Sequence, residues 1–475
     1  MNSLATEMDA SPKIPSLLLA AGIFAEILAL VLSLQFPLEI FAVICGVGVL
    51  YWSAKDTFFG LCFLVLLHYF VIQGTEGISL MEGVFALCFC CVLGSWFFRK
   101  LFLERSKILR DHLDYAVAGF LALCVFSLVP AVLSGASFGK WLRELIPFLN
   151  LLLVFPLRDE LNSTRRIKII SACFLTLSII VAVHSIFAYK QAIISAVYAW
   201  ELLALRQYTN APLFLAILIF GSAFFILGRT KMESGTALLI TMFFALALII
   251  TFARGYWIAA ALGVLAIFWL LPARDKTRMT IYFGILTLIT IGVVFIFFGD
   301  LAEFFLKTIS SRFHTVGGAV QDKSFANRLA EWQAVFAQIK ANPVLGYGLG
   351  KTYSYNALIP IEMPTWYVHN TFLFVWYKIG LFGLIALVLF LAGMLARGLH
   401  IYRTNNDKFL KAFSLGLVGC IIALVVVSFS SPQFIEKDSS LLGALIGGII
   451  QAVSARGANK TGETSYPFAA QNRQV

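Results

Sequence analysis

Few residues of this chain could carry chemistry, and the best placed of them is His369. It lies in the stretch TWYVHNTFLFVWYKIG, where a hydrophilic segment meets an apolar one. An imidazole at such a boundary can face both water and a membrane-embedded molecule, and it ordinarily titrates near neutral pH, so it can accept a proton there. We therefore predict that His369 is a general base. The alternative is an interfacial anchor or a helix cap.

Three arginines are candidates for binding an anion. Arg254 is the only charged residue in the apolar stretch 236–271, and an arginine at mid-span costs about 2.5–3.5 kcal/mol on insertion scales. Arg206 precedes another apolar run, and Arg328 lies in NRLAEWQ. Because guanidinium groups match a diphosphate through forked hydrogen bonds, we predict that these three bind a lipid-linked diphosphate. The alternatives are snorkelling for Arg254 and an ion pair with Glu331 for Arg328.

The segment VLGYGLGKT ends like a phosphate-binding loop, but Leu345 stands where that motif requires its first glycine. We predict instead that Gly346, Gly348 and Gly350 give a flexible return of the chain, at which the backbone can approach a bound group. The alternative is a plain glycine-rich connector.

Two other groups of residues are given structural roles. Arg143 is followed by Glu144, and we expect an ion pair between them. The eight cysteines all lie in apolar segments without the spacing of a zinc or redox site. We therefore expect no metal and no cofactor.

The composition indicates a protein of the lipid bilayer. Of the 475 residues, 60% are hydrophobic and only 13% are charged, whereas a soluble protein is about one quarter charged. Apolar runs long enough to span a membrane lie near 15–34, 37–53, 57–73, 78–98, 114–134, 141–157, 166–190, 211–228, 235–253, 255–271, 279–299, 369–396, 409–430 and 438–454. The predicted fold is an all-α polytopic integral membrane protein with about 12–14 transmembrane helices.

The loop charges predict the orientation. If the spans alternate, 23 of the 36 lysines and arginines fall on one side, which is then the cytoplasm. The predicted organisation is a cytoplasmic N-terminus (1–14), eleven spans (15–299), a periplasmic loop (300–368), three spans (369–454) and a cytoplasmic tail (455–475). The glycine segment then lies outside the cytoplasm, so we expect neither a nucleotide nor a nucleic acid as partner.

The long loop is predicted to contain an amphipathic helix that ends at Asn342-Pro343. Its apolar residues recur every three or four positions, at Leu329, Trp332, Val335, Phe336 and Ile339. This helix would lie against the membrane surface or the transmembrane bundle.

The combined motifs resemble those of the O-antigen ligase and polymerase family. They are NRLAEWQAVFAQIKANPVLGYGLG at 327–350, His369-Asn370-Thr371-Phe372-Leu373, and the glycine-rich Gly380-Leu-Phe-Gly383. ARGYW around Arg254 resembles the Ser-Arg-Gly motif of the family, with Ala253 in place of serine. The resemblance covers roughly residues 200–400.

The resemblance implies a metal-independent, inverting glycosyltransferase of the bacterial inner membrane. It would take a glycan from undecaprenyl diphosphate on the periplasmic face and pass it to a hydroxyl of lipid A-core or of another glycan. Arg254 and Arg206 would hold the diphosphate, Arg328 would help to position the donor or the loop, and His369 would activate the acceptor. A polymerase of O-antigen or exopolysaccharide is the alternative within the family, and a membrane transporter is a further one.

Overall fold

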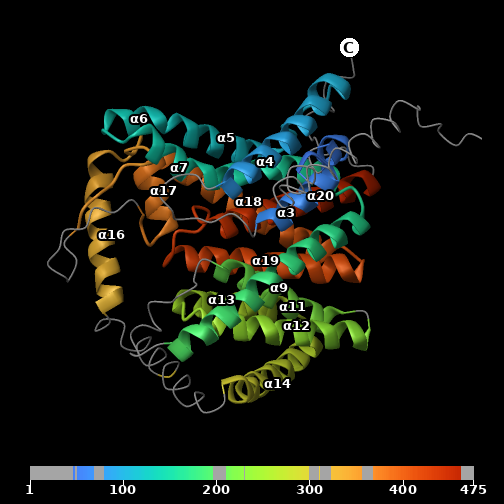
Figure 1. Cartoon of the computed structure of the whole chain (residues 1–475). Helices are drawn as coiled ribbons and strands as arrows, with labels where there is room; N and C mark the ends of the chain where they lie inside the picture. The colour runs from blue at the N-terminus through green and yellow to red at the C-terminus, as the bar shows by residue number, and fades with distance from the viewer. Residues whose placement is uncertain are drawn as a thin grey trace, which may run out of the picture.

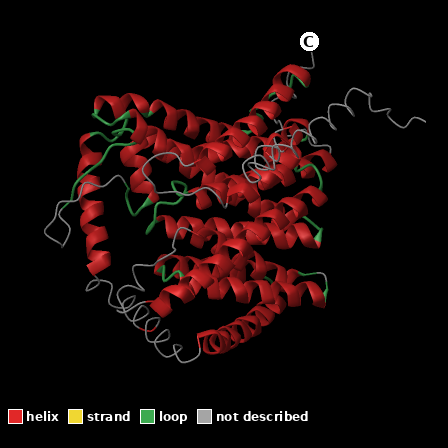
Figure 2. Ribbon diagram, viewed as in Figure 1, coloured by secondary structure: helices red, strands yellow, loops and turns green. Residues whose placement is uncertain are grey.

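The structure is a computed structural model that describes residues 46–48, 51–68, 80–195, 210–228, 230–298, 310, 323–355 and 367–461. Within these ranges the regular elements are all helices, and no strand occurs (Figure 2). The predicted all-α class is confirmed.

The main helices follow one another along the chain, mostly with short connections, and longer stretches separate α9 from α11, α14 from α16 and α16 from α17. They are α3 (Thr57–Leu67), α4 (Leu80–Phe98), α5 (His112–Phe126), α6 (Leu128–Leu133), α7 (Phe138–Leu149), α8 (Val154–Glu160), α9 (Thr164–Ser195), α11 (Ala211–Leu227), α12 (Lys231–Ile250), α13 (Arg254–Leu270), α14 (Ala273–Phe298), α16 (Lys323–Ala341), α17 (Thr371–Ile379), α18 (Leu381–Thr404), α19 (Lys408–Ser428) and α20 (Lys437–Thr461). A π-helical turn, η2 (Arg99–Leu103), extends α4, and a 3-10 turn, η3 (Asn150–Leu153), joins α7 to α8.

Seven helices in the described part of the chain are long and apolar enough to cross a membrane, and three shorter apolar helices accompany them. The protein is therefore polytopic, as its composition predicts. The predicted first span, 15–34, lies outside the described residues, so the number of 12–14 spans and the division of the chain between the two sides of the membrane stay predictions.

Two helices that are apolar on all sides form the centre of the bundle. In α11 and α19 most residues are buried, because both pack against neighbours around their circumference. The helices α12, α13, α18 and α20 surround this pair. Most of the bundle helices run side by side, while α16 stands across them at one edge of the molecule (Figure 1).

The predicted span 369–396 is not one helix. It is divided at Gly380 into the short α17 and the long α18. Gly380 has a φ of 86°, and a Cβ on it would lie 2.1 Å from the carbonyl oxygen of Val344. Only glycine fits this position, and the break lets α17 lie beside the segment that follows α16.

The predicted span 141–157 is also interrupted. It corresponds to α7, η3 and α8, with prolines at 147 and 156. Proline has no backbone N–H to donate and its ring disturbs the preceding turn, which accounts for the change of helix type between the two prolines.

Candidate functional site

His369 and Glu331 are joined where α16 passes the start of α17. The His369 Nδ1 lies 2.7 Å from Oε2 of Glu331, and the His369 backbone N–H donates to Oε1, also at 2.7 Å. Glu331 is 1% exposed, whereas the His369 side chain is 35% exposed. Because a carboxylate accepts, Nδ1 carries the hydrogen, and in the neutral imidazole the lone pair is then on Nε2. The pair can thus present Nε2 as a proton acceptor to a bound molecule.

The buried carboxylate of Glu331 has further support. The Tyr353 hydroxyl donates to Oε1 at 2.9 Å, so three donors compensate for the desolvation of the carboxylate. Burial, and then the nearby Glu331 charge, raise the pKa of the Tyr355 phenol above its ordinary value. A carboxylate held in this way fixes the tautomer and orientation of the imidazole and stabilises its protonated form.

Helix α16 confirms the predicted loop helix but turns a different face to the bundle. It ends before Asn342, as predicted, and Val335 and Ile339 are buried. Leu329 is 44% exposed and Phe336 is 41% exposed, so the buried line of α16 runs through Glu331 instead. The spacing of Glu331, Val335 and Ile339 is four residues, which places all three on one face.

The residues after His369 fix the start of α17. The Asn370 side chain accepts from the backbone N–H groups of Phe372 and Leu373, both at 3.0 Å, as a helix cap does. The Thr371 hydroxyl accepts from the Gln433 backbone N–H at 2.6 Å. His369 therefore sits on a capped helix start that is anchored to the loop between α19 and α20.

The same loop holds the start of α13, which begins at Arg254. The Gln433 Nε2 donates to the Tyr256 hydroxyl at 2.8 Å, and Tyr256 is buried. A Cβ on Gly255 would lie 2.5 Å from the Ser430 hydroxyl oxygen. The loop that anchors the helix of His369 thus also anchors the helix of Arg254, and it brings together two motifs that are more than a hundred residues apart.

Of the other two predicted arginines, the structure describes Arg328 but not Arg206. Arg328 lies on α16, one turn before Glu331, and is half-buried. Its predicted partner Glu331 directs its carboxylate to His369 and Tyr353. Arg206 lies outside the described residues. The roles predicted for Arg254, Arg206 and Arg328 in binding a diphosphate stay predictions.

The glycine segment packs closely against the bundle. Gly346, Gly348 and Gly350 all have positive φ angles, of 68°, 84° and 80°. A Cβ on Gly348 would lie 2.2 Å from the Ala131 backbone nitrogen, and one on Gly350 would lie 2.6 Å from that of Trp141. The close backbone approach seen here is therefore to α6 and α7, while an approach to a bound group stays a prediction.

A buried ion pair fastens this segment to two helices. The Lys378 ammonium lies 3.0 Å from both carboxylate oxygens of Glu144, and Oε2 of Glu144 also accepts from the Gly350 backbone N–H at 2.7 Å. The expected pair between Arg143 and Glu144 is therefore wrong, and Arg143 is exposed. The physical reason is helical geometry, because adjacent residues point in different directions and only Glu144 faces the bundle.

Sequence reasoning missed Glu331 as the partner of His369. The signal was present, since an acidic residue stood in register with the apolar stripe of the loop helix. It was interpreted as a partner for Arg328, the nearest basic residue on the same helix. Lys378 within a span was a similar signal for Glu144.

Residues 237–388, about a third of the chain, match the model of the O-antigen ligase family. The match extends from α12 into α18 and so includes Arg254, α16, the glycine segment and His369. It confirms the resemblance found in the sequence motifs. The protein is thus a polytopic membrane protein in which residues 237–388 are similar to the O-antigen ligase family. No curated protein matches the chain.

Proposed function

We propose that this protein is an O-antigen ligase-like glycosyltransferase, which transfers a glycan from undecaprenyl diphosphate to a hydroxyl of lipid A-core on the periplasmic face of the bacterial inner membrane. Both termini would lie in the cytoplasm. The family match supports this class of function. The observation that carries the proposal is the Glu331–His369 pair, which resembles the oriented imidazoles that serve as general bases.

In the proposed reaction, Nε2 of His369 removes the proton of the acceptor hydroxyl. The hydroxyl oxygen attacks the anomeric carbon of the donor sugar, and the bond from that carbon to the diphosphate oxygen breaks. The electron pair leaves with undecaprenyl diphosphate, and attack opposite the leaving group inverts the anomeric centre. Glu331 stabilises the imidazolium that forms.

The leaving diphosphate gains negative charge in the transition state, and arginines match this group best. Arg254 is proposed to bind the diphosphate, because its helix start shares a loop with that of His369. Arg206 and Arg328 are proposed to complete the donor site. The driving force comes from the diphosphate ester, so the proposed reaction needs no nucleotide. The arginines would neutralise the leaving diphosphate in place of a metal.

The test is transfer by the purified protein in proteoliposomes that contain undecaprenyl diphosphate-linked glycan and lipid A-core, with EDTA and without nucleotide. We expect glycan on lipid A-core together with free undecaprenyl diphosphate. A product in which two lipid-linked glycans are joined would identify the polymerase alternative. Movement of the donor between leaflets without any transfer would identify a transporter and overturn the proposal.

A further inference from the structure

A cavity of about 430 Å³ lies between α9, α11, α12, α19 and α20. Its lining includes no residue of α16, of α17 or of the loop between α19 and α20. The cavity is therefore separate from the His369 site, and its size is in the range of ordinary ligand sites.

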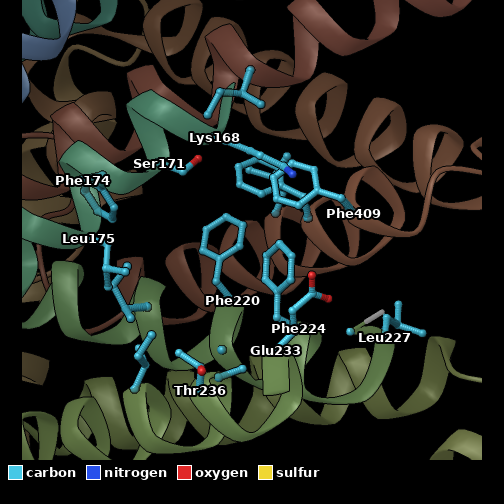
Figure 3. A pocket seen from close by; sticks show the side chains of 18 of the residues that line it. Lys168, Ser171, Phe174, Leu175, Phe220, Phe224, Leu227, Glu233, Thr236 and Phe409 are labelled. Atoms are coloured by element: carbon cyan, nitrogen blue, oxygen red, sulfur yellow. The ribbon is translucent and has the colours of Figure 1, made fainter. Parts of the chain in front are cut away.

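The walls of the cavity are apolar, with a group of phenylalanines on one side. The ring centroids of Phe220 and Phe413 are 5.0 Å apart, and those of Phe224 and Phe409 are 5.4 Å apart. Phe220 and Phe224 extend from α11 toward Phe409 and Lys168 (Figure 3). Aliphatic residues of α9 and α20 complete the lining. Such walls suit a hydrocarbon chain.

The charged residues of the lining all lie at helix ends on one side of the bundle. Lys168 is in the first turns of α9, Glu233 is in the first turn of α12, and Lys408 is the first residue of α19. Both lysines are exposed, and Nζ of Lys168 lies 4.8 Å from the ring centroid of Phe409. The two ammonium groups outnumber the one carboxylate, so this end of the cavity favours an anion.

The length of the cavity corresponds to one leaflet of a bilayer. Along α11 the lining extends from Ile217 to Gly228, which is about 16 Å at 1.5 Å per residue. This is about half of the ~30 Å hydrocarbon core of a membrane. The apolar end therefore lies near the bilayer centre, and the charged end lies at the headgroups.

We propose that this cavity is a binding site for an anionic glycerophospholipid. One acyl chain occupies the apolar space, and Lys168 and Lys408 contact the phosphate at the membrane surface. Basic pockets between transmembrane helices recognise anionic headgroups in this way. The loop charges assign this end to the cytoplasmic side, so the lipid belongs to the leaflet opposite the His369 site.

The first test fills the cavity. Native mass spectrometry of the delipidated full chain, titrated with phosphatidylglycerol, measures the affinity for the first bound lipid. Ile240→Trp places an indole in the space, and we expect the tightest binding event to be lost. Leu239→Trp is the matched control, because Leu239 is the next residue of α12 but is 66% exposed and does not line the cavity. Equal binding by both variants would overturn the proposal.

The second test concerns the headgroup and does not depend on a bulky substitution. Lys168→Gln and Lys408→Gln should each weaken phosphatidylglycerol binding about fivefold, as expected for about 1 kcal/mol per lysine, and leave phosphatidylcholine binding unchanged. Lys231→Gln, an exposed lysine outside the lining, should have no effect. An equal affinity of the wild type for the two lipids would show that the cavity holds no specific anionic lipid, and would sink the idea.

Discussion

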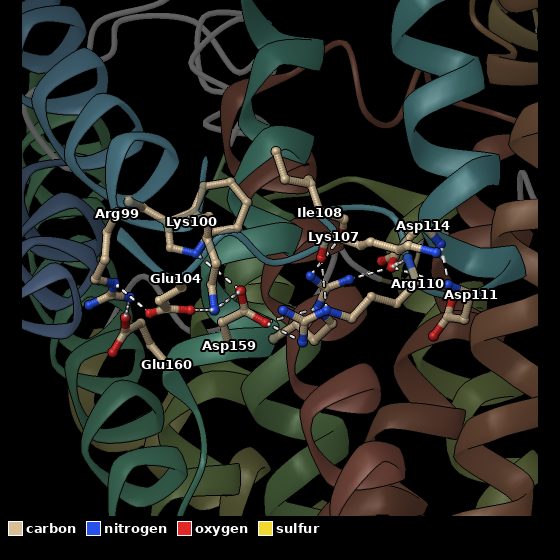
Figure 4. Close-up of polar contacts among 12 residues, drawn as sticks. Arg99, Lys100, Glu104, Lys107, Ile108, Arg110, Asp111, Asp114, Asp159 and Glu160 are labelled. Carbon is tan, nitrogen blue, oxygen red and sulfur yellow. Dashed lines mark hydrogen bonds and ion pairs between the residues drawn. The ribbon is translucent and has the colours of Figure 1, made fainter. Parts of the chain in front are cut away.

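Charged side chains gather in two regions of the described structure, around α8 and around the start of α17, and the two regions differ in what they leave accessible. Around α8, Asp159 is bound by Lys100 at 3.2 Å and by Arg110 at 3.0 Å (Figure 4). Glu160 is bound by Arg166 at 2.7 Å. Every acid of this network meets at least one base. The network holds the segment that follows η2 against α8, and we call it the closed region.

Around the start of α17, by contrast, the buried Glu331 meets the imidazole of His369, which retains one acceptor. We call this pair and its surroundings the open region. Glu331 holds Nδ1 of His369, and no hydrogen bond from a described residue reaches Nε2. The larger network has more ion pairs, and its carboxylates are neutralised by the lysines and arginines of the network itself. The comparison teaches that an accessible atom on a well-held side chain indicates chemistry better than the density of charge does.

The largest expected effect is on the open region. His369→Ala should lower glycan transfer by about 10²–10⁴-fold, the usual contribution of a general base. Donor binding should be unchanged, because the donor is assigned to the arginines. The unfolding temperature should fall, because the buried Glu331 carboxylate loses one of its three donors, so transfer is compared per folded molecule. Transfer kinetics, donor binding and thermal unfolding check this. Near-normal transfer would remove the base from the mechanism.

The closed region should respond in stability instead. Arg158→Met removes the partner of Asp114, which is fully buried, and such a loss costs about 3–5 kcal/mol of unfolding free energy. Arg110→Met is the matched control, since Arg110 is 39% exposed and an exposed pair contributes about 1 kcal/mol or less. Transfer per folded molecule should be normal in both variants, as measured by unfolding in detergent and by the transfer assay. Equal unfolding free energies of the two variants would show that the buried Arg158–Asp114 pair does not stabilise the fold.

Glu331→Gln sharpens the comparison within the open region. The amide keeps the shape but loses the charge that stabilises the imidazolium, and we expect kcat to fall about 10–100-fold with an unchanged KM for the donor, as for carboxylates that orient other functional histidines. Glu104→Gln, in the closed region, where Glu104 pairs with Lys100, should leave kcat unchanged. A fall in stability without a fall in kcat per folded molecule would make Glu331 only a structural acid.

Arg254→Lys tests the donor site. Lysine retains the charge but loses the forked pair of hydrogen bonds to the diphosphate, so we expect transfer to fall about tenfold, the equivalent of one charge-assisted hydrogen bond. Arg274→Lys, an exposed substitution beyond the opposite end of α13, should be neutral. Wild-type turnover by the Arg254→Lys variant would mean that Arg254 merely reaches toward the headgroups.

The smallest expected effect is a pH dependence of stability next to the open region. Burial, and then the Asp438 carboxylate, raise the pKa of Glu436 to about 8, whereas an unfolded glutamate titrates near 4.3. The folded state therefore holds a proton that the unfolded state releases, and its stability falls as pH rises between these values. Glu436→Gln should remove this fall, so the wild type should lose more unfolding temperature than the variant between pH 6 and pH 8.5. Parallel pH profiles would contradict it.

Hydropathy and motif spacing predicted much of this fold, because they depend on local sequence. The all-α polytopic class and the loop helix up to Asn342 followed from apolar runs and their period. The division at Gly380 did not, since the run around it is apolar except for Lys378. Its cause is a contact with Val344, which no local pattern reveals.

For the candidate site, the sequence predicted some of the residues but not the contacts between them. His369 and Arg254 stood out as polar residues in apolar surroundings. Their common anchor Gln433, and the pairs of Glu331 with His369 and of Glu144 with Lys378, depend on which segments meet in space. A single sequence contains the charges of these pairs but does not show how they combine.

The short α17 has a consequence for the order in which the protein is made. With nine residues it is about 13 Å long, too short to cross the membrane by itself. Its carbonyl oxygens at Tyr377 and Lys378 accept from the N–H groups of Tyr347 and Gly348, at 2.8 and 2.9 Å, and its lysine pairs with Glu144, 234 residues upstream. Synthesis proceeds from the N-terminus, so α7 is inserted long before α17 leaves the ribosome. The His369 imidazole therefore reaches its place late in biogenesis, when the glycine segment and α17 pack together against α6 and α7, which are already in the membrane.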